Sequence, residues 1–353
     1  MERLPDYIKQ LRWGKTLYFF NELDVCVYRM QGHFDIIKCS TGETTRVNLK
    51  LAHQFVACNK TKRLFFVRRS FPRPDYSKPY VEGEVKNNLY FYVYDLVKNT
   101  YKKSKPFRGA SLFDASLRSF LSAQEDYMTI INIDGEILNV SLDTLEVEKV
   151  MRLDEFVEDP FRFFHNPWYR TEENIYETEV SRQKQWYEEP YDPARDNLFA
   201  KLDLSKKTLE FRPGDGGWYD TSVYLEDAGV WVHQKPNITN RMKATSFLFD
   251  IRKDDQIIWQ FEIPCSPFID SGLFWRGRNI FSFSANTFVI CFTTMIYLCD
   301  LQTKSLEGLF FVTGMADVFF DKANGHIIPV FFSGVTDDMV TLDDFTDVSD
   351  KSG

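Results

Sequence analysis

A strand–turn–strand pattern recurs along the whole chain and limits what it can fold into. In each copy an apolar, β-rich stretch ends near an Asp or a small polar residue, a short polar turn follows, and a second strand begins. The residues that precede the seven turns are Cys39, Asp95, Ser141, Asp203, Asp250, Asp300 and, in the weakest copy, Asp343. Because their separation is roughly fifty residues throughout, the sequence predicts seven similar units.

Two further strands precede most of these hairpins. Gln54–Cys58 and Arg63–Val67 lie before the second turn, and Ser222–Leu225 and Gly229–Val232 lie before the fifth. Four strands in a unit of this length are typical of propeller blades. The sequence therefore predicts an all-β β-propeller of about seven four-stranded blades. A pair of open sandwiches or two stacked barrels is the alternative that the pattern leaves open.

The two ends of the repeat are uneven. Tyr7–Trp13 adds a strand before the first unit, and the last unit, which ends at Met339–Asp343, has one strand too few. We therefore expect the N- and C-terminal strands to share a blade, which would close the ring and remove exposed sheet edges. The expected domain covers residues 1–345, and residues 346–353 are expected to form a short, disordered acidic tail.

Two of the hairpins resemble a known repeat. Tyr92–Thr100 and Leu202–Thr208 are similar to the third strand, turn and fourth strand of kelch-type repeats. Kelch units also carry a Gly-Gly doublet after the second strand and a Trp in the fourth. This chain has one doublet, Gly216-Gly217, placed between units, and Trp259 is the only Trp in a predicted fourth strand. The resemblance implies a divergent propeller, similar to kelch and related repeats, and no particular family among them.

The cysteines and the hydropathy pattern indicate the cellular environment. The six cysteines lie singly in apolar runs, without a C-x-x-C pair, so we expect buried, reduced thiols. The first residues lack the layout of a signal peptide, and no window approaches the ~18 apolar residues of a membrane span. These features predict a cytoplasmic or nuclear protein without a membrane partner.

The net charge of −8 is concentrated in one segment. Between Asp154 and Asp196, twelve Asp and Glu residues outnumber five Lys and Arg residues, and the rest of the chain is almost neutral. Phosphate contacts need a surplus of Lys and Arg, so this distribution argues against a nucleic-acid partner.

No linear motif of catalysis or metal binding is present in the sequence. The five histidines are far apart, and there is no H-E-x-x-H, no G-x-S-x-G, no P-loop and no G-x-G-x-x-G. We therefore expect no enzyme activity and no metal or other cofactor. A hydrolase or cyclotransferase with its site in the central funnel stays open, because side chains from different blades could meet there without a linear motif.

Three long connections between predicted second and third strands are the best candidates for function. They run over 70–87, 171–197 and 234–244. Connections of this type emerge on one face of a propeller, and loops longer than about twelve residues are usually functional or disordered. The first follows a run of basic residues, and the second belongs to an acidic, aromatic insertion at about 154–197 in the fourth blade.

Within the insertion, Ile175, Tyr176, Val180, Gln183 and Tyr187 recur at helical spacing, which predicts a short amphipathic helix. Exposed aromatic and Arg side chains supply much of the energy of protein interfaces. The candidate partner-binding residues are Trp168, Tyr176, Trp186, Tyr187, Tyr191, Arg68, Arg69, Arg73 and Arg241. Alternatively, the aromatic rings only pack the insertion onto its blade, and the basic residues form a solvated face.

These patterns predict a non-enzymatic scaffold or adaptor that binds a protein or peptide on the face bearing the long loops. One alternative is a substrate receptor subunit of a ubiquitin-ligase-type complex. The other is the enzyme with its site in the central funnel. The sequence leaves the oligomeric state open.

Overall fold

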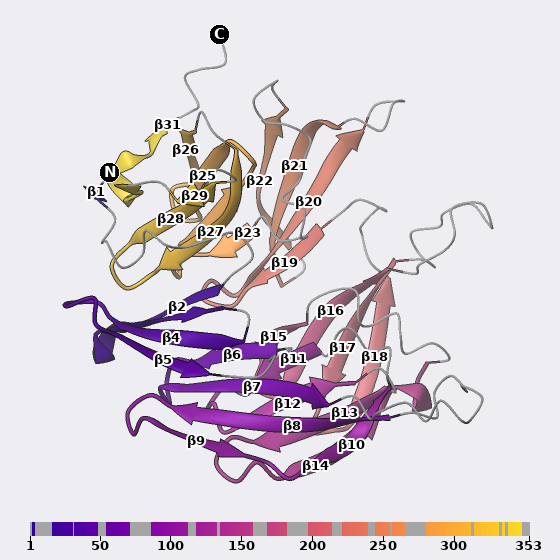
Figure 1. Cartoon of the computed structure of the whole chain (residues 1–353). Helices are drawn as coiled ribbons and strands as arrows, with labels where there is room; N and C mark the ends of the chain where they lie inside the picture. Colours follow the sequence, from indigo (N-terminus) through magenta and orange to yellow (C-terminus); the bar gives the residue numbers. More distant parts are fainter. Residues whose placement is uncertain are drawn as a thin grey trace, which may run out of the picture. The chain divides into compact units, whose positions relative to one another are not determined.

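The computed structural model describes most of the chain, and its regular structure is antiparallel β-sheet with short 3-10 helices (Figure 1). The described residues are 2–3, 16–30, 32–48, 54–70, 86–111, 118–132, 135–157, 168–181, 197–213, 221–238, 244–254, 256–265, 280–311, 314–331, 334–335 and 338–347. Within them, strands follow one another as antiparallel meanders of four or five, which are the blades of a β-propeller. The predicted all-β propeller class is confirmed.

Six sheets have four or more strands in the described residues, and we number them as blades 1 to 6. Blade 1 contains β2 (Thr16–Phe20), β3 (Val25–Arg29), β4 (His33–Lys38) and β5 (Thr44–Asn48). Blade 2 contains β6 (Gln54–Cys58), β7 (Arg63–Ser70), β8 (Lys86–Asp95), β9 (Thr100–Lys103) and β10 (Phe107–Ser111), the last two both pairing with β8. Blade 3 contains β11 (Arg118–Leu121), β12 (Tyr127–Ile131), β13 (Glu136–Ser141) and β14 (Val147–Arg152).

The remaining three blades follow the same order. Blade 4 contains β15 (Tyr169–Glu172), β16 (Ile175–Ser181), β17 (Asn197–Asp203) and β18 (Thr208–Pro213). Blade 5 contains β19 (Thr221–Leu225), β20 (Val230–Ile238), β21 (Ala244–Lys253) and β22 (Gln256–Pro264). Blade 6 contains β23 (Ile280–Ser282), β24 (Thr287–Cys291), β25 (Met295–Asp300) and β26 (Ser305–Phe310), to which β31 (Thr346–Asp347) adds a fifth strand.

The predicted count of seven blades is wrong, because the seventh hairpin does not form. Its marker, Asp343, lies in the 3-10 helix η4 (Leu342–Asp344), where the Asp344 carboxylate accepts hydrogen bonds from the backbone N–H and hydroxyl of Thr341. The strands before it, β27 (Met315–Asp321), β28 (His326–Phe331) and β29 (Gly334–Val335), form a sheet of three described strands.

The described residues do not include a ring closure by the predicted terminal strands. Tyr7–Trp13, the expected N-terminal strand, lies outside the described residues. The described pairing near the termini is shorter: β1 (Glu2–Arg3) pairs with β30 (Asp338–Met339) in a separate two-stranded sheet.

The predicted insertion in blade 4 is also different from the expectation. Within the range 154–197, β15 and β16 are the first two strands of the blade. The helical spacing through Ile175 and Tyr176 is misleading, because Tyr176 and Thr178 are buried at every second position of a strand. From Tyr169 to Ser181 the insertion is therefore two strands joined by a turn, and Asp154 and Glu155 belong to a 3-10 helix, η2 (Leu153–Glu155).

The chain divides into two compact units, each with its own packed core. Blades 2, 3 and 4 belong to one unit. Blades 1, 5 and 6 and the sheet of β27–β29 belong to the other, apart from a few residues of β4 and β5. In the first unit, Phe65 and Phe91 of blade 2 pack against Ile130 and Leu138 of blade 3, and all four side chains are fully buried.

Carboxylates hold the turns that the sequence pattern identified. Oδ1 of Asp95 accepts the backbone N–H groups of Val97 and Lys98, at 3.0 and 2.9 Å. Asp203 and Asp300 each accept the same pair of bonds, from the backbone N–H groups two and three residues later in the chain, at 2.7–3.0 Å. These are Asx turns, which give the backbone a local partner where the strand ends.

A second bond ties each of these turns to the other hairpin of the blade. The residue after the Asp, or after Ser141 in blade 3, donates its N–H to a carbonyl in the turn between the first and second strands. The four such pairs with a leucine donor are Leu96 to Lys62, Leu142 to Asp126, Leu204 to Asn174, and Leu301 to Asn286, at 2.7–3.1 Å. The two turns of blades 2, 3, 4 and 6 are thereby fixed side by side at one end of each sheet.

Asp250 departs from the pattern that the sequence suggested. It lies within β21 rather than in a turn, and its carboxylate is 2% exposed. Lys235 donates to it at 3.0 Å and Gln260 at 2.6 Å. Although burial opposes it, these two bonds and the charge of Lys235 hold the pKa of Asp250 below its usual range.

All six cysteines are free, as predicted. Cys26, Cys58, Cys291 and Cys299 are buried, whereas Cys39 and Cys265 are half-buried. Burial raises the pKa of Cys58 to about 12 and that of Cys299 well above its usual value. Four of the thiols are therefore protected both from reagents and from ionisation.

The Asx turns can be tested by removing one carboxylate at a time. We expect Asp203→Ala and Asp300→Ala each to lower the free energy of unfolding by about 1–2 kcal/mol, because two backbone N–H groups of the turn lose their acceptor in each variant. Asp343→Ala removes the marker of the hairpin that does not form. This variant should change the free energy of unfolding by less than about 0.5 kcal/mol. Urea denaturation measures the difference, and equal losses in all three variants would contradict the assignment.

The same turns predict a dependence on pH. The backbone N–H of Lys206 lowers the pKa of Asp203, and that of Thr303 lowers the pKa of Asp300. Their stabilisation is therefore present above the unfolded pKa of about 4 and is lost as the pH falls through the lower folded value. Asp203→Asn and Asp300→Asn should each reduce the loss of stability at low pH. If the free energy of unfolding falls with pH in the variants as it does in the unmodified protein, these two carboxylates do not cause the dependence.

Thiol labelling tests the burial of the cysteines. At pH 8 in the native state, we expect an exposed-thiol reagent to modify Cys39 and Cys265 first. The other four should react only after unfolding, because their sulfur atoms are shielded and protonated. Mass spectrometry of the labelled peptides identifies the sites, and rapid modification of Cys58 or Cys291 would show the cores to be open.

Candidate functional site

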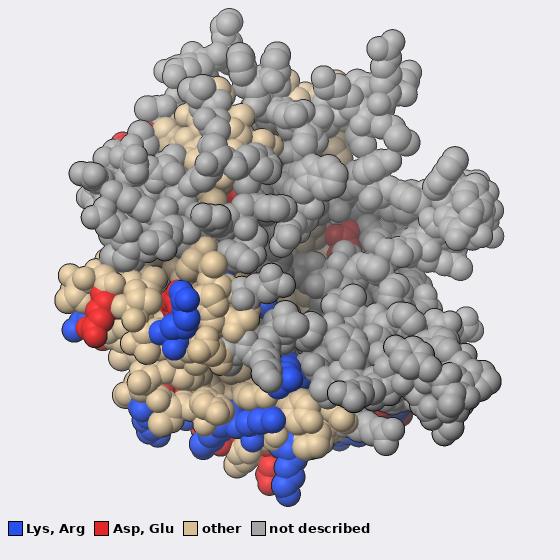
Figure 2. All heavy atoms as spheres, viewed as in Figure 1, with Lys and Arg blue, Asp and Glu red and all other residues tan. Residues whose placement is uncertain are grey.

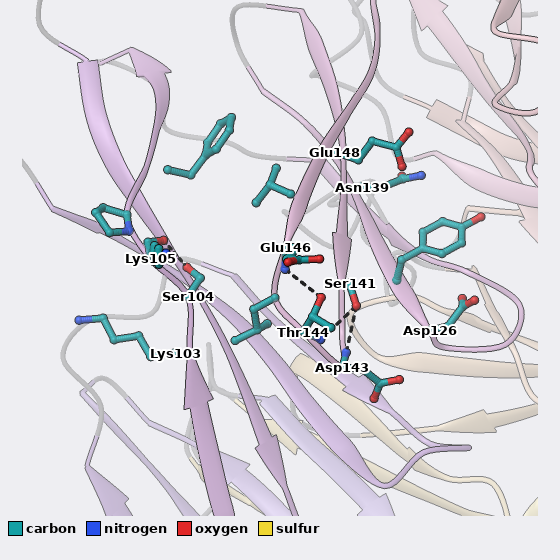
Figure 3. Close-up of a pocket in the computed structure, with 15 residues that line it drawn as sticks. Lys103, Ser104, Lys105, Asp126, Asn139, Ser141, Asp143, Thr144, Glu146 and Glu148 are labelled. Atoms are coloured by element: carbon teal, nitrogen blue, oxygen red, sulfur yellow. Dashed lines mark hydrogen bonds between the residues drawn. The ribbon is translucent and has the colours of Figure 1, made fainter.

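A groove of about 1160 Å³ lies between the edges of blades 2 and 3 (Figure 3). Its first wall is the segment Lys103–Phe107, which leads from β9 into β10. Its second wall is the β13–β14 hairpin from Ser141 to Glu148, with Asn139, Asp126 and Tyr127 beside it. Figure 3 shows Lys103, Ser104 and Lys105 on one side and Thr144 and Glu146 on the other. We call this the 2–3 groove.

Local hydrogen bonds make the hairpin wall rigid. The Ser141 hydroxyl oxygen accepts the backbone N–H groups of Asp143 and Thr144, at 3.3 and 3.1 Å, so it replaces the Asp of the other turns. Leu145 has a φ of 61°, and its N–H donates to the Ser141 carbonyl at 2.9 Å. The side chains of Leu142 and Leu145 anchor the turn in the core between the blades.

The first wall is tied to the centre of blade 2. The Ser104 hydroxyl accepts the N–H of Phe91 at 3.0 Å and donates to the Lys105 carbonyl at 2.6 Å. The N–H of Ser104 donates in turn to the Phe91 carbonyl at 2.9 Å. Both walls are thus held by backbone bonds, without relying on the long side chains at their surface.

Hydrogen bonds and an ion pair join blades 2 and 3 at the end where their turns lie. The Glu125 carboxylate accepts from the N–H and hydroxyl of Thr61, at 2.8 and 3.1 Å. Arg63 forms an ion pair with Asp143 at 2.5 Å, and Lys102 donates to the Asp143 carbonyl at 3.0 Å. The spacing of the groove walls is therefore fixed by the fold.

The groove presents charged groups that have no partner among the described residues. Lys105 on the first wall and Glu146 and Glu148 on the second are exposed, and their charged ends make no ion pair or hydrogen bond there. Asp126 and Asp143 add two more carboxylates to the second wall. In Figure 2, Lys and Arg side chains gather over the region where Figure 1 places β9 and β14, with acidic side chains among them.

Arg68, one of the predicted partner-binding residues, lies at a smaller pocket of about 190 Å³. The pocket is lined by Val47, Asn48, Phe66, Arg68, Tyr92, Tyr94 and Tyr101. Phe66 stacks on Tyr92 with ring centroids 5.0 Å apart, and the Lys103 ammonium lies 4.4 Å from the Tyr90 ring. The half-buried Arg68 guanidinium thus stands beside an aromatic surface.

Trp168 and Tyr176, also predicted to contact a partner, lie in the core between blades 3 and 4. Tyr176 is fully buried and Trp168 is 7% exposed. The Phe120 ring lies 4.2 Å from Tyr176 and 6.1 Å from Trp168, measured between centroids. Neither ring is available at the surface in this structure, in agreement with the packing alternative.

The other predicted site residues lie wholly or partly outside the part of the chain that the structure describes. Trp186, Tyr187, Tyr191, Arg73 and Arg241 lie outside the described residues, and for Arg69 only the backbone in β7 is described. The residues of the 2–3 groove were missed as a site. Their turn, Ser141–Thr144, was identified in the sequence, but nothing in the sequence indicated that it faces Lys105 across two blades.

Blade 5 contains a Ser–His contact in a row of cross-strand neighbours. The Ser222 hydroxyl lies 2.8 Å from Nδ1 of His233, and His233 is opposite Asp250 on the next strand. Ser222 and His233 are both buried, and the Asp250 carboxylate is held by Lys235 and Gln260. An acyl-transfer site needs an accessible nucleophile, which this row does not provide.

The part of the chain that the structure describes holds no cluster of three or more His, Cys, Asp or Glu side chains arranged for a metal ion. A search of the same residues finds no helix with the length and apolar character needed to span a membrane.

Comparison with known proteins gives a fold and no family. No protein-family model matches the chain, and no curated protein matches its sequence. Solved structures do match. The β-propeller domain of Myceliophteria thermophila Cps50 (Swd1) aligns over 94% of this chain and 98% of its own length, with 9% identity and a TM-score of 0.53.

Two further structures reach the same TM-score of 0.53. U3-55K is 8% identical over 92% of this chain and 90% of its own length. The tricorn protease is 9% identical over 96% of this chain, which spans only 35% of the protease chain. At these identities the likeness shows the β-propeller fold alone, and it gives no support to kelch-type repeats in particular.

The core position of Tyr176 can be tested by truncation. Tyr176→Ala removes a fully buried ring that contacts Phe120, so we expect the free energy of unfolding to fall by about 3–5 kcal/mol. Tyr101→Ala, which removes a ring that is 66% exposed, serves as the control and should cost less than about 0.5 kcal/mol. Equal melting temperatures for the two variants would contradict the core position.

Proposed function

We propose that this chain is a non-catalytic interaction module that holds an extended, net basic segment of a partner protein in the 2–3 groove. The observation that carries the proposal is the pair of rigid walls with unpaired charges: Lys105 on one side, and Glu146 and Glu148 on the other. Acidic groups outnumber basic ones in the groove, so a segment rich in Lys or Arg fits it best.

The dimensions of the groove support a chain segment over a small molecule. Pockets for small ligands have volumes of about 300–1000 Å³ and are mostly apolar. The 2–3 groove is larger and is lined mainly by polar and charged side chains. Walls that are held by backbone hydrogen bonds lose little conformational entropy on binding, which improves the affinity that a given contact area can provide.

An adaptor role continues to be our proposal for the protein as a whole. A scaffold or a substrate receptor would both use such a groove, and they differ only in the partner. Trp186, Tyr187, Tyr191, Arg69, Arg73 and Arg241 are proposed as an additional contact region on the loop-bearing side. Binding is favoured over catalysis because the Ser222–His233 contact is buried and its neighbour Asp250 is already engaged.

Charge reversal in the groove tests this function. The probe is a capped, fluorescently labelled nine-residue peptide of alternating lysine and serine. We expect Glu146→Lys combined with Glu148→Lys to weaken its binding at least tenfold, because two attractive charges become repulsive. Lys105→Glu should strengthen binding. Fluorescence anisotropy at low salt measures both, and the effect should shrink as the salt concentration rises.

The matched control is a double variant with the same change of net charge elsewhere. Glu172→Lys with Glu210→Lys alters two exposed carboxylates of blade 4 and should change the affinity less than twofold. All variants should keep the melting temperature of the unmodified protein. If the control weakens binding as much as the groove variant, attraction depends on overall charge, and the groove is not the site.

A further inference from the structure

The fourth strands of the blades differ in how their free edges are protected. Natural proteins protect exposed sheet edges with charged residues, above all Lys, or with Pro. Without such residues, the unpaired N–H and C=O groups of the edge can pair with another strand. The strands β5, β9, β14 and β18 follow this rule, since they contain Arg46, Lys102, Lys149 and Arg212, respectively. β22 and β26 contain neither Lys nor Arg, and β22 has its single Pro, Pro264, only at its last position.

The edge of β26 is covered by the chain itself. β31, from the C-terminal part of the chain, pairs with it through Glu307–Asp347 and Gly308–Thr346. Of the two strands without a basic residue, one therefore already carries an added fifth strand. This pairing shows that such an edge in this protein accepts an extended segment.

The edge of β22 has no such cover, since no described strand pairs with it beyond β21. β22 is nine residues long, compared with six for β26, and Glu262 is its only charged residue. Ile257 and Ile258 are 50% and 36% exposed. An edge that is long, apolar and without basic residues is the kind that recruits a strand.

The strand is also held firmly enough to act as a template. Ile258 forms a β-bulge, but from Trp259 to Pro264 every residue pairs in regular register with β21. Phe261 stacks on Phe249 with centroids 5.0 Å apart, and Trp259 lies 4.5 Å from Phe261. The outward N–H and C=O groups between Trp259 and Ile263 are thereby presented in one fixed geometry, whereas Pro264 has no N–H.

We infer that the free edge of β22 binds an extended segment of a partner protein, which adds to blade 5 as a fifth strand in the way that β31 adds to blade 6. Main-chain hydrogen bonds supply the affinity in this mode of recognition, and alternate side chains supply the specificity. The fitting segment has apolar residues at alternate positions and a basic residue near Glu262. The site is separate from the 2–3 groove and does not depend on it.

A second copy of this chain fits the edge less well than a peptide segment. Stable interfaces between folded proteins bury about 1200–2000 Å², and one strand edge offers only part of that area. Two chains that each carry a charge of −8 also repel one another. An extended segment needs only the strand edge. A basic residue in that segment is attracted by the negative charge of the protein.

The test uses the whole chain and a defined probe, a capped peptide of sequence Lys-Val-Thr-Val-Thr-Val-Thr-Val-Lys. Amide hydrogen exchange is followed with and without the probe. We expect amides within Trp259–Glu262 to exchange at least tenfold more slowly when the probe is bound. The same peptide with its central Thr replaced by Pro should give no protection, because it cannot continue the pairing.

Variants locate the site. Ile258→Lys places a lysine on the edge and should abolish the protection, whereas Phe211→Lys, on the already basic strand β18, should leave it unchanged. Ile258 and Phe211 are similarly exposed, at 36% and 41%. Gln256→Lys provides a second edge variant if Ile258→Lys lowers the melting temperature. The groove variant Glu146→Lys with Glu148→Lys should retain the protection, which separates this test from that of the proposed function.

Three results would overturn the inference. The first is the absence of protection at β22 with a saturating probe. The second is protection confined to β26, which would mean that the probe displaces β31. The third is a dimer in sedimentation velocity of the chain alone that Ile258→Lys dissociates, because a second copy would then occupy the edge.

Discussion

The fold depends on one repeated interaction, the pairing of two turns at the same end of blades 2, 3, 4 and 6. A side-chain oxygen from Asp95, Ser141, Asp203 or Asp300 accepts two backbone N–H groups and reverses the chain into the fourth strand. The next residue, a leucine in all four, donates to the turn between the first two strands. This bond sets the register of a whole meander, because fixing both turns fixes which residues of the four strands lie opposite one another.

The candidate sites are consequences of this arrangement. In blade 3 the turn oxygen comes from Ser141, and the hairpin that follows it carries Glu146 and Glu148 into the 2–3 groove. Contacts between neighbouring turns, such as Glu125 with Thr61, then fix the opposite wall. The fourth strands are left at a sheet edge, where protection depends on their own residues or, for β26, on β31. The two proposed binding surfaces therefore both lie where a blade ends.

The sequence was sufficient for the parts of the fold that local chemistry determines. Gln54–Cys58 is a strand with the expected bounds, and the predicted strands Arg63–Val67 and Ser222–Leu225 lie within β7 and β19, because apolar alternation and polar turns specify them locally. Asp343 failed as a marker because Thr341 and Asp344 favour a 3-10 turn there, and Asp250 failed because the half-buried Lys235 engages it within the strand. Tyr176 was predicted to lie on a helix because a buried aromatic residue occurs equally on a helix face and in the core of a sheet.

The groove could not be predicted, since it joins Lys105 and Glu146 from different blades. Such a contact depends on tertiary packing, which no local pattern encodes.

Native-state hydrogen exchange of the four turn leucines tests the account most directly. If their N–H bonds to the neighbouring turns organise the blades, the amides of Leu96, Leu142, Leu204 and Leu301 exchange as slowly as those of the central strands β8, β13, β17 and β25. Exchange of these four amides at the rate of exposed loop residues, with the central strands still protected, would contradict it.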